Sequence, residues 1–376
     1  MQFPYQSPAE WQYFQWAQNQ KKNETERLKK TGTEVGLIVL GSIGMSFLIA
    51  IADIVLGMIV SKGSITPFTE AVKAMNHGQV WYLLTYLMQY VLMMGIPLLI
   101  AGILSRRRHI PLAPTKAFDP ALSILMVFFG FGAISAANYC GSAILSFFES
   151  VGLSPLEVPN MQDGTWTGLV LNIIIVAVAP AILEELLFRG YVLQSLRVAG
   201  DRNALLISSF LFGLMHGTIQ QIPFAFLLGL VFGYIVLKTG DIRTSMVLHF
   251  LNNGISVVLE FISMNKPESF GNTLYMIFYI VSVTLGVVGT AVLVGRFRTR
   301  TPVVGDNPSP FLTEKEKAKA TIFSTGMIIF IVCMLIVTVA GSGLLEALSD
   351  FPSSSSGIPF GPDSDTASIL RGLFHG

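Results

Sequence analysis

The chain has 376 residues, of which 52% are hydrophobic and 12% are charged, and its mean hydropathy is +0.62. Soluble domains contain about 25% charged residues, so this composition excludes a protein that exposes most of its surface to water. The formal net charge of +1 provides no basic face for nucleic acid. We therefore expect a multi-pass membrane protein that contacts lipid and binds no nucleic acid.

Nine apolar runs are long enough for membrane-spanning helices, which need about 20 residues each. In chain order they cover residues 36–60, 80–104, 121–148, 166–197, 203–219, 222–238, 244–262, 273–295 and 321–346. The fifth and sixth runs are the shortest. The sequence thus predicts an all-α polytopic transmembrane bundle of about nine helices.

Composition divides the chain into three regions. Residues 1–33 form a polar N-terminal arm, residues 34–346 form the transmembrane domain, and residues 347–376 form a tail rich in Ser, Pro and Gly that we expect to be disordered. The arm combines aromatic residues with a Lys/Arg cluster. This pattern fits either an amphipathic helix at the lipid interface or a solvated, partly disordered segment.

Lysine and arginine are shared unevenly between alternate loops. With nine spans, 20 of the 24 cations fall on the side of the N-terminal arm. The remaining four are Lys62, Lys73, Lys266 and Arg371. Because cytoplasmic loops carry an excess of Lys and Arg, we expect a cell-membrane protein with a cytoplasmic N-terminus and an external C-terminus.

Ionisable and amide side chains inside the apolar runs gather in three spans. They are Glu184, Glu185 and Arg189 in the fourth, His216 in the fifth, and His249, Asn252 and Asn253 in the seventh. Each group taken singly is explained as well by helix packing as by function. Charge inside hydrocarbon is costly, so a gathering of acids, imidazoles and amides favours function over packing alone.

Spacing within the fourth span assigns different roles to its acids. Glu185 and Arg189 are four residues apart and share a helix face, so we expect a structural ion pair. Glu184 is rotated by about 100° around the helix axis and is left to enter a cavity. Pro180 deprives the Val176 carbonyl of its helical donor, which predicts a kink or a widened, wet cavity.

The two histidines are expected to reach the same depth as Glu184. At about 1.5 Å per residue, Glu184 and His216 each lie about 20 Å from the basic ends of their helices. His249 and Asn253 are four residues apart, so an imidazole and an amide share one face and can address one ligand. The sequence predicts that all four line one cavity that opens toward the cytoplasm.

This set of side chains suits the activation of water for amide hydrolysis inside the membrane. Glu184 would be the general base, His216 would hold the water, and His249 with Asn253 would donate to an oxyanion. In the alternative, Glu184, His216 and His249 are the protein ligands of a catalytic zinc ion whose fourth position holds water. The sequence leaves both mechanisms open.

Three short motifs stand in order in this part of the chain. They are EExxxR at 184–189, FxxxH at 212–216 and HxxxN at 249–253. Together they resemble the motifs of the type II CAAX prenyl endopeptidases, a family that also contains bacteriocin-processing and self-immunity proteins. The resemblance spans roughly residues 166–262 and implies an intramembrane endopeptidase core, in which Glu184 and His216 activate water and His249 and Asn253 bind the oxyanion.

Function classes other than an endopeptidase also fit these residues. The endopeptidase hypothesis implies a membrane-associated or lipidated peptide substrate. The alternative is a non-enzymatic membrane scaffold or an immunity or regulatory protein with the same fold. A proton-coupled transporter is disfavoured, because the outer ends of the polar spans offer little polarity beyond Glu260. Helices outside the core leave room for a membrane-protein partner.

Overall fold

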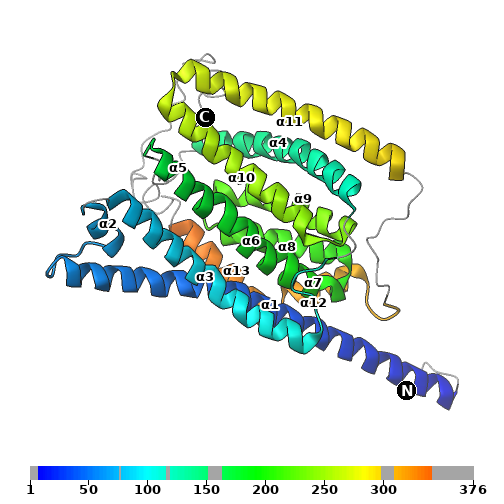
Figure 1. The fold of residues 1–376 in the computed structure, drawn as a ribbon. Coiled ribbons are helices and arrows are strands. Elements are labelled where there is room, and N and C mark those ends of the chain that lie inside the picture. Colours follow the sequence, from blue (N-terminus) through cyan, green and yellow to red (C-terminus); the bar gives the residue numbers. More distant parts are fainter. Residues whose placement is uncertain (1–6, 76–77, 116–118, 151–162, 298–308, 341–376) are drawn as a thin grey trace, which may run out of the picture.

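The computed structural model is a helical bundle (Figure 1) and describes residues 7–75, 78–115, 119–150, 163–297 and 309–340. These ranges contain no strand, only an isolated bridge between Thr115 and Asp241. The predicted all-α fold is confirmed. The tail predicted at residues 347–376 lies outside the described residues.

The helices follow the predicted order. They are α1 (Pro8–Val60), α2 (Phe68–Lys73), α3 (Gly78–Arg108), α4 (Pro120–Ser150), α8 (Asp201–Met215), α9 (Gln221–Thr239), α10 (Ile242–Asn265), α11 (Glu268–Phe297), α12 (Glu314–Ile322) and α13 (Thr325–Ala340). The fourth span changes helix type along its length. It comprises α5 (Trp166–Asn172), the π-helix η1 (Ile173–Val178), α6 (Ala179–Glu185), the π-helix η2 (Leu186–Val192), α7 (Leu193–Leu196) and the 3₁₀ turn η3 (Arg197–Ala199).

The number of spans differs from the predicted nine. Within the described residues, seven helices are long and apolar enough to cross a membrane, and an eighth span results if α12 and α13, bent by 65°, count as one. The fifth predicted span is only the 15-residue helix α8, about 22 Å long. It ends at His216 because Gly217 adopts a φ of +70°, a left-handed conformation that terminates helices. The chain is a multi-pass membrane protein.

Most segments predicted to lie on the basic side meet at one end of the bundle. The contacts that join them are Lys21 to Glu316, Arg108 to Glu34, Ile242 to Pro114 and Asn203 to Glu314. The N-terminal end of α8 and the C-terminal end of α9 both lie among these segments. The short α8 therefore does not change the alternation of the loops, and the cytoplasmic placement of this end stays a prediction.

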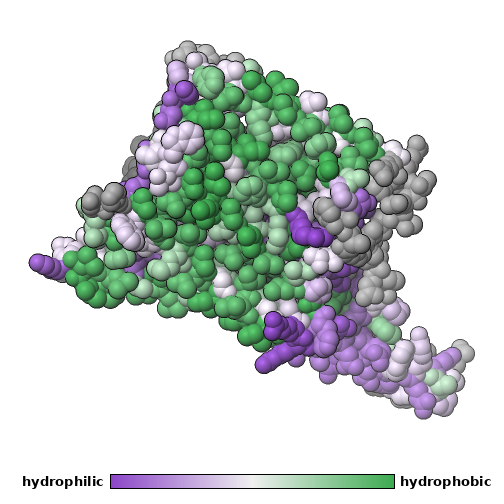
Figure 2. Space-filling model, in the orientation of Figure 1, coloured by the Kyte–Doolittle hydropathy of each residue, from purple (hydrophilic) through white to green (hydrophobic). Residues whose placement is uncertain are grey.

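The N-terminal arm and the first predicted span are one helix, α1, which has 53 residues. Its length is about 80 Å, about twice the thickness of a bilayer with its headgroups. The hydrophilic N-terminal part projects from the bundle (Figures 1 and 2). Trp16 packs edge-on against Phe311 at 5.5 Å, and Leu28 is buried in a cluster with Leu312. The arm thus packs against the segment that leads into α12.

Helices α1 and α13 cross with their backbones in contact. A Cβ atom added at Gly36 would lie 2.5 Å from the carbonyl oxygen of Gly326, and one added at Gly326 would collide with the backbone of Thr33. Close approach through small residues is a common way for membrane helices to associate. The crossing fixes α13 against the N-terminal half of the first span.

The Gly36→Ala variant should be less stable by about 1–3 kcal/mol, because the added methyl group must separate two backbones. The better helix propensity of Ala opposes this effect by about 1 kcal/mol. Gly44→Ala is the matched control, since a methyl group at Gly44 would have no other atom within 4 Å. Thermal unfolding in detergent measures both variants. Equal unfolding midpoints for the two variants would contradict the close crossing of α1 and α13.

Candidate active site

The candidate site is built on the fourth span, where two π-helical segments flank the acids Glu184 and Glu185. Single π-helical turns inside α-helices are frequent at functional sites. Pro180 begins the short α-helical section between them. The Val176 carbonyl, predicted to lose its helical donor, accepts a hydrogen bond of 2.8 Å from the Asn253 side-chain amide. A polar bond between two spans therefore lies next to the proline.

Glu185 is the fully buried acid at the centre of the site. Its Oε1 lies 3.0 Å from Arg189 Nη1, which confirms the predicted ion pair, and 3.1 Å from His249 Nδ1. A buried carboxylate is stabilised only when it is paired and hydrogen-bonded. Glu185 thus depends on partners from its own span and from α10.

Arg189 is buried between aromatic rings as well as next to its acid. Its guanidinium carbon lies 4.2 Å from the ring centroid of Phe212 and 5.1 Å from that of Phe232. In the described part of the chain, Arg189 Nη2 has no hydrogen-bond acceptor. The ring faces offset part of this deficit through cation–π attraction. Phe212 of the FxxxH motif and Phe232 of α9 therefore help to stabilise the charge of Arg189.

His249 lies between the two acids. Its ring stacks on Phe232 with centroids 5.0 Å apart, its Nδ1 contacts Glu185, and its Nε2 is 4.0 Å from Glu184 Oε2. A carboxylate accepts a hydrogen bond from Nδ1–H, which selects the tautomer. Neutral His249 then presents its Nε2 lone pair toward Glu184, and protonated His249 presents an N–H there.

Glu184 is 8% exposed and takes no part in the ion pair of Glu185 with Arg189. It is not free, however, because its Oε1 accepts a hydrogen bond of 2.7 Å from the Tyr90 hydroxyl. Its second oxygen is the one turned toward His249. Sequence analysis missed Tyr90 because nothing in the apolar sequence of α3 indicates which residue faces the fourth span.

His216 contacts the cluster through Phe212. It is the residue at which α8 ends, its Nδ1 is 2.9 Å from the carbonyl of Phe212, and its ring meets the edge of Phe212 at 5.0 Å. Phe212 also contacts the ring of His249, at 6.5 Å. No hydrogen bond joins His216 to Glu184 in the described residues. The predicted cluster is therefore assembled around Glu184, Glu185, Arg189 and His249, and it reaches His216 through an aromatic ring.

Asn253 lies one turn beyond His249 on α10, as its spacing predicted. Its amide nitrogen donates to Val176, and its Oδ1 accepts from Asn252 at 2.9 Å. An amide nitrogen carries two hydrogens, so one N–H is left for another acceptor. Asn253 therefore ties two spans together and retains a donor.

The zinc ligands predicted from the sequence are Glu184, His216 and His249. Their side chains are of types that bind zinc, but they are not grouped around one position. Both histidines use Nδ1 on a protein acceptor, which leaves Nε2 as a metal ligand would need. In the ranges the structure describes, however, no three His, Cys, Asp or Glu side chains are grouped to hold one ion. We derive no catalytic step through a metal.

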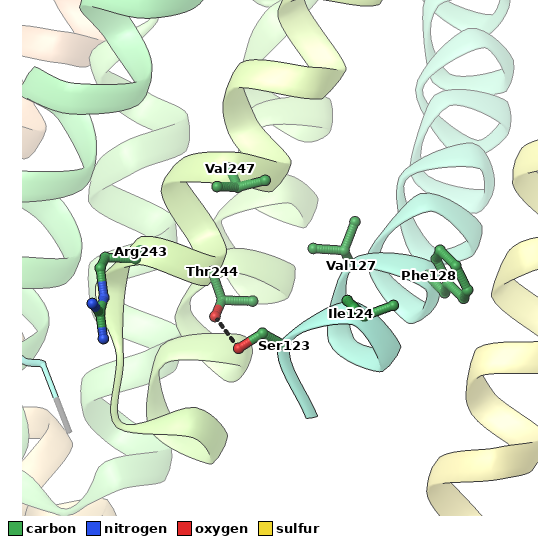
Figure 3. A pocket seen from close by; sticks show the side chains of 7 residues that line it. All are labelled: Ser123, Ile124, Val127, Phe128, Arg243, Thr244 and Val247. Atoms are coloured by element: carbon green, nitrogen blue, oxygen red, sulfur yellow. Dashed lines mark hydrogen bonds between the residues drawn. The ribbon is translucent and has the colours of Figure 1, made fainter. Parts of the chain in front are cut away.

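A pocket of about 360 Å³ lies between α4 and α10 (Figure 3). It is lined by Ser123, Ile124, Val127, Phe128, Arg243, Thr244 and Val247. Thr244 donates to Ser123 at 3.0 Å across its floor. The lining includes no predicted site residue, because α10 turns Thr244 toward α4 and His249 toward the fourth span. This pocket is distinct from the predicted catalytic cavity.

Comparison with known proteins agrees with the motifs. Residues 166–255 match the family model "Type II CAAX prenyl endopeptidase Rce1-like". The chain is also similar to the membrane-embedded CAAX protease MroQ of Staphylococcus aureus (strain USA300), with 28% identity over 116 residues that cover 28% of this chain and 47% of that protein. The chain thus spans about half the length of this curated relative. No solved structure matches the chain.

The segment that matches contains every residue of the three motifs, and it forms the fourth span, α8, α9 and part of α10. The fold and the cluster define a polytopic helical membrane protein with a buried Glu–His site. Through this segment, the chain is similar to the type II CAAX prenyl endopeptidases. Tyr90 lies outside the matched residues.

Replacing Arg189 by Met should destabilise the fold by about 3–5 kcal/mol, because a buried carboxylate loses its cation. The double variant Glu185→Gln/Arg189→Met should recover much of this loss, since the charge that needed compensation is also gone. Lys21→Met is the control, because Lys21 and its partner Glu316 are 43% and 41% exposed and such pairs contribute about 1 kcal/mol or less. Unfolding midpoints in detergent provide the comparison. Equal losses for the two single variants would contradict a buried pair.

Proposed function

We propose that the chain is an intramembrane endopeptidase that hydrolyses a peptide bond in a membrane-associated or lipidated peptide or protein. The main support is the approach of Glu184 Oε2 to His249 Nε2, 4.0 Å apart and buried in the membrane-spanning bundle. The same segment matches a family of endopeptidases. The substrate class is inferred from the similarity of this segment to that family and from the membrane location of the site.

The separation of these two atoms suits a shared water molecule. A distance of 4.0 Å is too long for a direct hydrogen bond but shorter than two successive bonds of about 2.8 Å. One water can therefore lie within reach of both atoms. Glu184, whose other oxygen is held by Tyr90, would remove a proton from this water as it attacks the substrate carbonyl.

His249 is proposed to stabilise the oxyanion. The attacking water and the oxyanion are bonded to the same carbon, so a donor next to the Glu184-bound water is also near the developing charge. Protonated His249 would donate through Nε2 while Glu185 holds Nδ1, and the remaining N–H of Asn253 would be a second donor. Donors fixed before the reaction are the effective ones in such sites.

His216 is proposed to complete the site from the end of α8 once substrate is bound. Its Nδ1 is engaged with its own helix, which leaves Nε2 for the water or for the leaving amine. Catalytic contacts are often long without substrate and tighten in the complex. We also propose that the end of the bundle that gathers the Lys/Arg-rich segments faces the cytoplasm, which is supported by the bias of 20 cations to 4.

Glu184→Gln should reduce cleavage of a lipid-anchored, quenched-fluorescent peptide by about 10²–10⁴-fold, the usual contribution of a general base. Glu260→Gln is the matched control, since it removes a partly buried acid of α10 that lies outside the cluster. Both variants should keep the unfolding midpoint of the wild type. Normal cleavage by Glu184→Gln would refute the mechanism and favour a scaffold or regulatory role.

The mechanism assigns every step to side chains of the chain itself, so prolonged treatment with a chelator should leave the cleavage rate within about twofold of its starting value. Wild-type protein with and without added zinc is the comparison, with the rate and the bound metal measured on the same samples. A loss of activity that zinc restores would show that Glu184, His216 and His249 close around an ion.

A further inference from the structure

Tyr90 is a polar contact of the site that comes from outside the segment shared with the endopeptidase family. Its hydroxyl donates to Glu184 Oε1 at 2.7 Å, whereas the family match begins at residue 166. The bond joins α3 to the fourth span inside the bundle. Hydrogen bonds to a carboxylate are stronger than those between neutral groups.

Helix α3 is held on both sides of this contact. Gln89, the neighbouring residue, donates to Asp53 of α1 at 3.0 Å. Leu83 and Leu87 pack in one cluster with Ile175 of the fourth span. Leu83, Leu87 and Tyr90 follow one another at intervals of four and three residues and so lie on one helix face. The helix face that carries the Tyr90 hydroxyl is thus held in place by contacts with α1 and with the fourth span.

The bond determines how Glu184 presents its second oxygen. With Oε1 held by Tyr90, Oε2 is the atom that lies 4.0 Å from His249 Nε2.

We infer that Tyr90 is a positioning residue that holds Glu184 in the orientation of a general base. This inference rests on the proposed function. It extends the site to α3 and accounts for a hydroxyl in an apolar helix face. A tyrosine that only filled space at this position would not need its hydroxyl.

Tyr90→Phe removes the hydroxyl and keeps the ring. We expect kcat to fall by about tenfold, in line with the strength of a hydrogen bond to a charged group, and KM to stay within about twofold. Tyr86→Phe is the matched control: Tyr86 lies one turn earlier on α3 and is 37% exposed. It should leave kcat and KM unchanged.

A second variant strengthens the bond rather than removing it. Incorporation of 3-fluorotyrosine at position 90 makes the phenol a better donor and changes its size little, so kcat should stay at or above the wild-type value. A lower kcat for Tyr90→Phe together with a retained kcat for the 3-fluorotyrosine protein would support the inference. An unchanged kcat for Tyr90→Phe, or a lower rate that accompanies only a lower unfolding midpoint, would overturn it.

The Glu184→Gln result separates this inference from the proposed function. If Glu184→Gln abolishes cleavage while Tyr90→Phe behaves as wild type, the endopeptidase mechanism stands and the role of Tyr90 falls. If Glu184→Gln cleaves normally, the proposed function fails, and the inference about Tyr90 fails with it.

Discussion

The structure depends on the burial of one carboxylate, Glu185, in the interior of a membrane-spanning bundle. An unpaired charge there would strongly destabilise the fold, so groups next to Glu185 must compensate it. Arg189 supplies the opposite charge and His249 supplies a hydrogen-bond donor. Phe212 and Phe232 cover the guanidinium of Arg189. These contacts fix the fourth span, α8, α9 and α10 relative to one another.

The site uses two adjacent acids in two different ways. Glu185 faces the compensating groups, whereas Glu184, one residue earlier and about 100° around the helix, faces α3 and the open side of His249. The imidazole links them, because Glu185 orients Nδ1 while Nε2 is turned to Glu184. The backbone of the fourth span is irregular at its π-helical segments and at Pro180. The Asn253 side-chain amide donates a hydrogen bond to the carbonyl of Val176 in this region. His249 thus contributes both to the stability of the fold and to the proposed chemistry.

Contacts within a single helix could be predicted from the sequence, and contacts between helices mostly could not. The four-residue spacings correctly placed Glu185 with Arg189 and His249 with Asn253 on common faces, and composition established the all-α membrane fold. The bond from Tyr90 to Glu184 depends on the register of α3 against the fourth span, which periodicity does not specify. The early end of α8 follows from the left-handed backbone of Gly217. Hydropathy does not detect that stop, so nine spans were predicted where the described residues contain seven or eight. The predicted closeness of His216 to Glu184 stays a prediction.

The tautomer of His249 is the sharpest probe of the contact between Glu185 and His249, because it requires no substrate. Protein with ¹⁵N-labelled histidine can be studied by NMR in detergent micelles, and His249→Gln assigns the signal among the five histidines of the chain. Neutral His249 should carry its proton on Nδ1, and Glu185→Gln should weaken this preference. A proton found on Nε2, with Nδ1 bare, would contradict the contact.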